Sequence, residues 1–372
     1  MGPYFWVKDL LSRPSSGGVV RVVLFPLALA GWVYGQVQAL RRWAYRRGVL
    51  SSVRPLVPVV SVGNVTAGGT GKTPCVQTVC RLLQQRGLRP AVLSRGYGGS
   101  LRGAVAAVSD GERVLLDADQ AGDEPVMLAH TLPGVPIVVG ARRSDGARLA
   151  VEELRAEVLV LDDGFQHLQL ARDLDLVTVD ARLPFANGHC FPRGLLRETP
   201  RALRDADLVL LTRTRRVEPR CIEATRREVE RHVPDRPVLT SAHAPVALVD
   251  LANGAAHPLQ RLQGLKILAI AGIGQPELFF QDLKDQGADV LQTVPYPDHH
   301  RFQPDEVAQL NQWAGLMNAD AVVTTEKDGV RLREFLPLRV PVLALRIEVQ
   351  VSDPGALARV LDEMLQRRRS NG

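Results

Sequence analysis

The sequence lacks several features that mark particular protein classes. Aromatic residues make up only 5% of the chain. The four cysteines form no Cys-x-x-Cys pair and do not cluster, so we predict neither a disulfide nor a zinc site. There is no internal repeat, and the longest apolar run, residues 22–34, is shorter than the ~20 residues that span a bilayer. The 45% of hydrophobic residues is ordinary for a globular protein, and the chain is long enough for two domains.

Acidic residues are nearly absent from the N-terminal region. Residues 1–54 hold eight Lys or Arg and one Asp, a charge of +7, which leaves the remainder near neutral. The basic residues lie beside the apolar stretch 19–37 and not on a folded domain. This position disfavours binding to nucleic acid and favours binding to a membrane surface. Arg41, Arg42, Arg46 and Arg47 have no acidic residue near them in sequence, so we prefer a helix in the headgroup layer to one packed on the protein's own core.

A glycine-rich segment after residue 58 is the strongest motif. A β-branched run, residues 58–62, leads into a loop that ends in Gly-Lys-Thr before a helical pattern, which predicts a phosphate-binding loop. Glycines let backbone N–H groups surround a polyphosphate at a helix N-terminus. Lys72 is expected to reach the β- and γ-phosphates and Thr73 to hold Mg²⁺. The predicted nucleotide-binding residues are Thr66, Ala67, Gly68, Gly69, Thr70, Gly71, Lys72 and Thr73, with Thr66 standing where the usual pattern has glycine.

Strand and helix patterns alternate along the rest of the chain. This alternation predicts an α/β fold of the P-loop NTPase type, a mostly parallel sheet with helices on both faces. From residue 244 a second, smaller α/β set begins. The predicted parts are an N-terminal membrane-associated segment (1–50), a P-loop core domain (51–243) and a smaller domain (244–372) that closes over the nucleotide site.

Two aspartates end the predicted strand at 158–162. A carboxylate at this end of a strand beside a phosphate loop is suited to hold Mg²⁺, so Asp162 and Asp163 are candidate metal ligands, and which of them binds directly stays open. The alternative is a turn that only ends the strand.

Other motifs are weaker by themselves. Asp123 precedes Pro125 at a helix start, where the residues alone favour a helix cap over catalysis. Arg95, Tyr97 and Arg143 follow predicted strands and suit an anionic, sugar-like ligand. The pair His299 and His300 is compatible with acid–base or metal chemistry and equally with a solvated loop.

Taken in order, these segments resemble the tetraacyldisaccharide 4′-kinase family of lipid A biosynthesis. The resemblance covers residues 50–330 through the phosphate loop and the runs Ser94–Gly98, Gly122–Pro125, Asp162–His167, Ala271–Gly274, Pro297–His299 and Thr325–Asp328. The phosphate loop, in which Thr66 replaces the usual glycine, also fits this family.

The resemblance implies a reaction and a set of roles. The γ-phosphoryl group of ATP would pass, with Mg²⁺, to the 4′-hydroxyl of a tetraacylated glucosamine disaccharide 1-phosphate at the cytoplasmic face of the bacterial inner membrane, with neither nucleic acid nor an obligate protein partner. Asp123 would be the base, oriented by His299, with Lys72 as the third catalytic residue. Because Asp123 and His299 fall in different predicted domains, we expect domain closure. Residues implied in substrate positioning are Arg95, Tyr97, Arg143, Gln166, His167, Arg197 and Glu198.

Two other functions are compatible with the motifs. One is a membrane-associated P-loop ATPase or GTPase that couples hydrolysis to partner binding, which a lipid acceptor would not stimulate. The other is a nucleotide-sensing scaffold without catalysis, in which Asp123→Ala would change little beyond stability.

Overall fold

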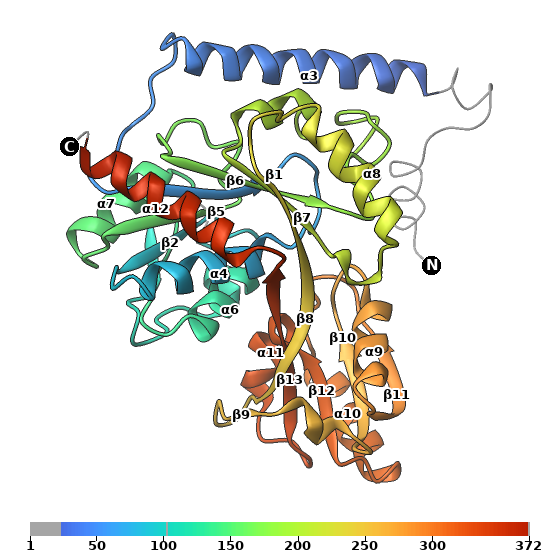
Figure 1. Ribbon diagram of the computed structural model, residues 1–372. Helices are drawn as coiled ribbons and strands as arrows, with labels where there is room; N and C mark the ends of the chain where they lie inside the picture. Colours follow the sequence, from blue (N-terminus) through green and yellow to red (C-terminus); the bar gives the residue numbers. More distant parts are fainter. Residues whose placement is uncertain (1–23, 102, 371–372) are drawn as a thin grey trace. The chain divides into compact units, whose positions relative to one another are not determined.

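The chain divides into two compact units. A computed structural model describes residues 24–101 and 103–370 (Figure 1). The first unit comprises residues 1–95, 142–243 and 349–372, and the second comprises 96–141 and 244–348. Residues 96–141 therefore group with the later part of the chain and residues 349–372 with the earlier part, whereas the sequence predicts continuous domains. Much of the predicted membrane segment, residues 1–23, lies outside the described residues.

The first unit is built on a parallel sheet in the order β8-β7-β6-β1-β5-β2. Its strands are β1 (Val59–Asn64), β2 (Pro90–Ser94), β5 (Val158–Asp162), β6 (Leu174–Asp180), β7 (Leu208–Thr212) and the start of β8 (Val238–Asp250). All five residues of β2, β5 and β7 are buried, as expected for parallel strands covered on both faces. Val62 of β1 pairs with Asp162 of β5, which sets the metal-site candidate beside the phosphate loop.

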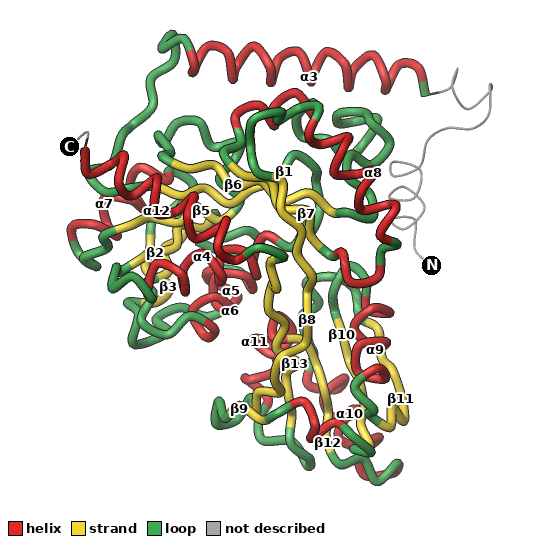
Figure 2. Tube along the Cα trace, viewed as in Figure 1, coloured by secondary structure: helices red, strands yellow, loops and turns green. Residues whose placement is uncertain are grey.

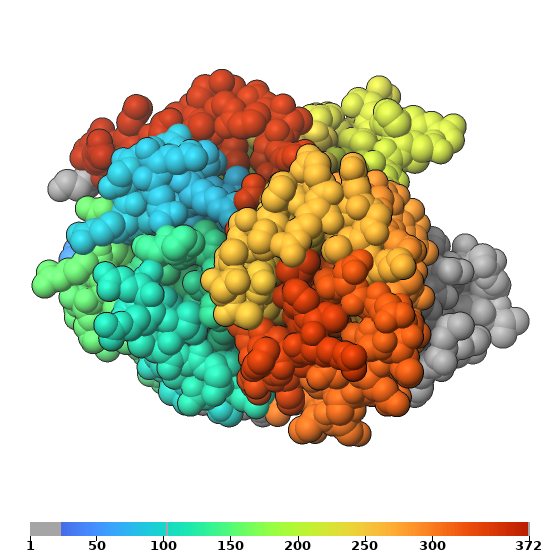
Figure 3. Space-filling model, turned by 90° about the horizontal axis from the view of Figure 1, so that it is seen from below, coloured from blue at the N-terminus to red at the C-terminus, as the bar shows by residue number. Residues whose placement is uncertain are grey.

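Helices complete this unit. They are α3 (Phe25–Arg46), α4 (Lys72–Gln84), α7 (Arg143–Glu152), α8 (Pro219–Glu230) and α12 (Pro354–Ser370) (Figure 2). The C-terminal helix α12 lies beside the segment that follows α4 (Figure 3), where Arg86 donates to Asp362 at 2.6 Å. Three residues of α12, Leu357, Leu361 and Met364, are buried. The end of the chain is thus part of the unit that carries the phosphate loop.

Helix α3 packs through a narrow stripe. Gly31, Gly35 and Arg42 are its buried residues, and a Cβ atom on Gly31 would lie 2.6 Å from the Cys190 carbonyl oxygen, so glycine is required for this close approach. The outer surface is apolar and exposed through Phe25, Leu27, Leu29, Trp32, Val33, Val37, Leu40 and Trp43. The helix therefore packs on the protein's own core, the alternative that the sequence disfavoured, and still presents an apolar face to solvent. Within the described ranges, no helix is long and apolar enough to cross a membrane.

The second unit has its own parallel strands in the order β11-β10-β12-β13. Their bounds are β10 (Lys266–Ala271), β11 (Asp289–Pro295), β12 (Ala321–Thr325) and β13 (Val342–Val351), with β9 (Ala256–His257) antiparallel to β8 and an antiparallel pair β3 (Ala106–Ser109) and β4 (Ile137–Val139). The helices are α5 (Ala118–Ala121), α6 (Asp123–Thr131), α9 (Pro276–Asp285), α10 (Pro304–Leu316) and α11 (Glu326–Leu332). Helix α6 contacts α11, β3 and β4, which explains why residues 96–141 belong to this unit.

Candidate active site

The phosphate loop joins β1 to α4 as predicted, and its backbone is held by neighbouring residues. The Asn64 side chain donates to Thr70 Oγ1 at 2.9 Å, and Thr70 Oγ1 lies 2.7 Å from Thr178 Oγ1. Thr66 is 8% exposed and forms an antiparallel bridge with Leu196. Where the usual pattern has a free glycine, this chain therefore has a residue paired with the segment that precedes Arg197.

Gly71 caps α4 in a conformation that favours glycine. Its φ of +80° is left-handed, and an added Cβ would lie 2.4 Å from His243 Cε1. This cap leaves Lys72 as the first residue of the helix, which gives the lysine a fixed starting point next to the N–H groups of the first turn.

Asp162 and Asp163 have different surroundings. Asp162 ends β5, is 3% exposed and accepts from Ser94 Oγ at 3.3 Å. Asp163 has a left-handed φ of +57° and turns toward two cations, with Lys72 Nζ at 3.4 Å and Arg197 at 2.7 Å. Burial would raise the pKa of Asp163, but the charges of Lys72 and Arg197 outweigh it and hold the pKa below its usual range. Asp163 thus lies within ion-pair distance of the lysine, whereas Asp162 lies at the end of β5 beside Ser94.

A magnesium ion would fit these residues with few protein ligands. Within the described ranges, no three His, Cys, Asp or Glu side chains gather as a metal site. Mg²⁺ is commonly held by one or two carboxylates together with water and substrate phosphates, so a site with few protein ligands is compatible with Mg²⁺. Asp162 and the hydroxyl of Thr73, in the first turn of α4, are the donors of suitable chemistry.

Cations surround His167 in the same unit. Burial, together with the charges of Arg143, Arg172, Arg41 and Arg95, lowers the pKa of His167 to about 4. Arg143 is 4% exposed at the start of α7, and burial lowers its pKa to about 10. This gathering of positive charge suits an anionic ligand.

Gln166 and Arg197 belong to loops that meet the phosphate loop. Gln166 Nε2 donates to the Asn64 carbonyl at 2.8 Å, and the Arg197 backbone N–H donates to the Val65 carbonyl at 2.8 Å. Both side chains are half-buried. They therefore support the loop in addition to any contact with a ligand.

Glu198 differs from the other implied substrate residues. It is 2% exposed and pairs with Arg42 at 2.5 Å, so its geometry favours a structural role over direct contact with a substrate. The same pair corrects the expectation that the basic residues of α3 lack acidic partners. Arg42 also pairs with Asp205, as does Arg46. Sequence inspection missed these partners because they lie more than 150 positions away.

Asp123 is the first residue of α6, and the structure contradicts its interpretation as a helix cap. Gly122 holds the cap position with a φ of +91°, where a Cβ would lie 2.3 Å from the Tyr97 carbonyl oxygen. Asp123 is 3% exposed, its Oδ2 lies 2.8 Å from His299 Nδ1, and its Oδ1 forms an ion pair with Arg331 at 2.6 Å. Burial would raise the pKa of Asp123, but the His299 hydrogen bond and the Arg331 charge outweigh it and keep the pKa low.

His299 is held by its loop in a defined orientation. Its φ is +61°, the hydrogen bond with Asp123 raises its pKa, and its Nε2 lies 3.3 Å from Lys327 Nζ. The half-buried imidazole also faces the exposed Tyr97 ring edge to face, with centroids 6.2 Å apart. His300 instead bonds Glu306 at 2.8 Å. Only the first of the two histidines faces the buried aspartate.

The segments Ala271–Gly274 and Thr325–Asp328, which are part of the family resemblance, support this arrangement. Asp328 Oδ2 accepts from the Gly272 N–H at 2.9 Å and from Thr325 Oγ1 at 2.7 Å, which joins the ends of β10 and β12. A Cβ on Gly272 would lie 3.0 Å from the Pro297 carbonyl oxygen. Asp123 and His299 both belong to the second unit. The expectation that they lie in different domains is therefore wrong, and their pairing needs no domain closure.

The family of the chain follows from comparison with known proteins. Residues 21–366 match the family described as Tetraacyldisaccharide-1-P 4′-kinase. The chain belongs to this family. A tetraacyldisaccharide 4′-kinase from Geobacter sulfurreducens is 43% identical over 362 residues, 97% of this chain and 99% of the relative. One from Anaeromyxobacter sp. (strain K) is 48% identical over 307 residues, 82% of this chain and 81% of the relative.

A solved structure shares the fold. The LpxK of Aquifex aeolicus, crystallised in an "apo" form in complex with ATP, has a TM-score of 0.77 and 29% identity, and the match covers 93% of this chain and 99% of that one. The resemblance seen in the sequence is confirmed, and the chain is a kinase of this family. The partner-coupled ATPase or GTPase is not favoured.

Proposed function

We propose that this chain transfers the γ-phosphoryl group of ATP to the 4′-hydroxyl of a tetraacylated glucosamine disaccharide 1-phosphate. Membership of the family supports the reaction, and the pairing of buried Asp123 with His299 is the structural observation that carries it. A carboxylate held ionised by a hydrogen-bonded imidazole is suited to take a proton from a hydroxyl group.

The phosphate loop, residues 66–73, is proposed to bind the triphosphate of ATP. Lys72 would contact the β- and γ-phosphates with its ammonium group oriented by Asp163. Thr73 and Asp162 would hold Mg²⁺, which neutralises charge on the phosphates when bound. Asp163 is thereby assigned to the lysine, leaving Asp162 as the direct metal ligand.

Asp123 is proposed to accept the proton of the acceptor hydroxyl. Its carboxylate has lone pairs beyond those facing His299 and Arg331, and His299 limits its rotation. Asp123 and the phosphate loop belong to different compact units. We therefore retain domain closure around ATP as a proposal, since the base must reach the hydroxyl that attacks the γ-phosphorus.

The acceptor is proposed to bind where cations gather. Arg95, Arg143 and His167 in the first unit suit the 1-phosphate or the sugar hydroxyls, and Tyr97, exposed beside His299, offers a flat apolar face to a sugar ring. Arg197 and Gln166 would position the disaccharide next to the phosphate loop.

The apolar outer face of α3 is proposed to lie on the cytoplasmic leaflet of the bacterial inner membrane as a peripheral contact. Trp32 and Trp43 are suited to the headgroup layer, and Arg46 and Arg47 follow them at the end of the helix, where acidic lipids would attract them. The acyl chains of the substrate would stay in the bilayer beside this helix.

The test is transfer of label from γ-labelled ATP to a tetraacyl disaccharide 1-phosphate in detergent micelles. Asp123→Asn should lower the turnover by about 10²- to 10⁴-fold while ATP binding is kept. Asp305→Asn, in the exposed first turn of α10, is the matched control and should keep full activity. Release of inorganic phosphate alone by the unmodified chain, with or without lipid, would contradict the kinase function.

A further inference from the structure

Arg42 on the inner stripe of α3 gathers an unusual set of partners. It is 6% exposed, and its guanidinium pairs with Glu198 at 2.5 Å and Asp205 at 2.9 Å. It also donates to the Phe165 carbonyl at 3.2 Å and lies over the Phe165 ring, 4.3 Å from the centroid. Two carboxylates, a carbonyl and an aromatic face thus share one buried cation.

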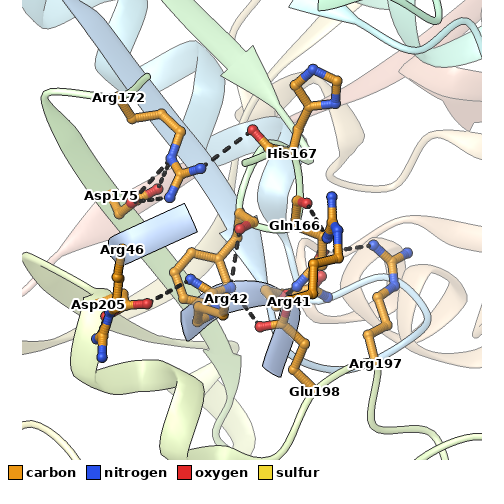
Figure 4. Close-up of polar contacts among 12 residues, drawn as sticks. Arg41, Arg42, Arg46, Gln166, His167, Arg172, Asp175, Arg197, Glu198 and Asp205 are labelled. Carbon is orange, nitrogen blue, oxygen red and sulfur yellow. Dashed lines mark hydrogen bonds and ion pairs between the residues drawn. The ribbon is translucent and has the colours of Figure 1, made fainter. Parts of the chain in front are cut away.

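Two of these partners, Phe165 and Glu198, come from two loops of the candidate active site, and Asp205 ends the short helix Pro200–Asp205. Phe165 follows the aspartates 162 and 163, and the neighbouring Arg41 donates to the Gln166 carbonyl at 3.1 Å. Glu198 follows Arg197, whose guanidinium binds Asp163 at 2.7 Å. Figure 4 shows Arg41 and Arg42 lying between Gln166 on one side and Glu198 on the other. The arginines of α3 therefore fix the loops 163–167 and 195–198 with respect to each other.

The chemistry of the guanidinium explains why arginine stands at this position. Its planar fork can bond several acceptors at once and stack on a ring, which a lysine ammonium cannot do. An exposed contact of this kind would contribute little, but a buried carboxylate that loses its partner is costly. Arg46, in contrast, is about half exposed and reaches only Asp205 among these acidic partners.

We propose that Arg42 is a positioning residue that couples α3, the lipid-facing helix, to the acceptor side of the active site. The inference rests on the proposed function. Helix α3 then does more than attach the chain to a membrane, because the same element that meets the lipid sets the loops that carry Gln166, Arg197 and the partner of Lys72. A misplacement of about 1 Å in such loops can cost about 10²-fold in rate.

The informative readout is the ratio of two products. Transfer to the lipid hydroxyl needs the acceptor loops in place, whereas hydrolysis needs only a water molecule at the γ-phosphate. Both products scale with the amount of folded enzyme, so a loss of stability alone leaves their ratio unchanged. The experiment measures inorganic phosphate and phosphorylated lipid from γ-labelled ATP with the full chain in micelles of a tetraacyl disaccharide 1-phosphate.

Arg42→Met should raise the ratio of inorganic phosphate to phosphorylated lipid by about 10- to 100-fold. Arg220→Met, which breaks the exposed ion pair with Glu218 at the start of α8, is the control and should leave it within about twofold, as salt-bridge losses at exposed sites are small. Binding of the variant to vesicles with acidic lipids should stay unchanged, because the apolar outer face is intact. Should Arg42→Met fail to fold, Arg42→Lys takes its place with the same thresholds.

The outcomes separate the two proposals. If the unmodified chain phosphorylates the lipid and the Arg42 variant keeps its product ratio within about twofold of it, the coupling is refuted and the kinase function stands. If the unmodified chain makes no phosphorylated lipid, the proposed function fails, and the coupling fails with it.

Discussion

Arg331, together with the hydrogen bond from His299, keeps the pKa of Asp123 low, and removal of Arg331 should change the pH dependence of the enzyme. The Arg331 side chain is largely buried and contacts Asp123 Oδ1 at 2.6 Å and Asp119 at 2.9 Å. Replacing it by methionine keeps most of the apolar stem and removes the charge. Asp123 would then keep only His299 and the more distant Lys327 against the effect of burial.

The size of the effect follows from the loss of one opposite charge in contact with a buried carboxylate. Such a charge lowers a carboxyl pKa by about 1–3 units, and each unit corresponds to about 1.4 kcal/mol. A carboxyl whose folded pKa is depressed stabilises the protein above its unfolded pKa, and this contribution is lost as the pH falls through the folded pKa. Arg331→Met raises the folded pKa of Asp123, so it should lower the free energy of unfolding at neutral pH by about 1.4–4 kcal/mol.

The same change should appear in catalysis, since a base must be ionised to accept a proton. In the unmodified enzyme the pKa of Asp123 lies below its ordinary value of 3.8. In the variant this pKa is higher, so kcat/KM for the lipid acceptor should begin to fall at a higher pH as the solution is made more acidic. The assay is kcat/KM from pH 4.5 to 8, paired with urea unfolding at pH 7. Arg301→Met is the control, because Arg301 forms an exposed ion pair with Asp119 at 3.3 Å and no ion pair with Asp123. A pH profile of kcat/KM and a free energy of unfolding equal to those of Arg301→Met would refute the reasoning.

Two further predictions concern the metal and the membrane. Asp162→Asn should raise the Mg²⁺ concentration for half-maximal activity by at least about tenfold. Asp163→Asn should leave that concentration within about threefold and should lower kcat, because Lys72 loses its partner. A titration of activity with Mg²⁺ in which the two variants show the opposite effects would contradict this assignment. The double change Trp32→Glu and Leu40→Glu replaces two side chains that are each 63% exposed, and it should weaken binding to acidic vesicles, measured by sedimentation, by about 10- to 100-fold. The control Leu316→Glu, on α10, should leave this binding unchanged. Equal vesicle binding by the two variants would exclude α3 as the contact surface.

The elements of the fold were largely predictable because their signals are local. The strand at 158–162 is found as predicted, and the phosphate loop stands between β1 and α4 as predicted. The β-branched runs and glycine punctuation that indicate these elements need no knowledge of distant partners. The long strand β8 was not predicted, because its residues 238–250 alternate only in part and include Pro245. The predicted domain boundary between residues 243 and 244 lies inside this strand.

The arrangement of the site depends on contacts that sequence separation hides. The pairing of Asp123 with His299 joins positions 176 apart, and it was expected only through the family resemblance. Arg331 was given no role, and Arg42 was counted only among the basic residues expected at the lipid headgroups, because each looks like one arginine among many until its buried partner is known. A basic residue on the inner stripe of an otherwise apolar helix was the one available signal for Arg42, since burying a charge requires a partner.

The membership of α12 in the first unit has a consequence for biosynthesis. The phosphate loop leaves the ribosome early, but the sheet strand β8 and the helix that covers the segment after α4 come much later, the helix as the last element of the chain. A nascent chain that ends before Pro354 therefore has its nucleotide-binding sequence without the apolar partners Leu357, Leu361 and Met364. The core that carries the phosphate loop is thus completed only after residues 354–370 have been made, and a chain that stops before them should be a substrate for chaperones and proteases instead of a nucleotide-binding fragment.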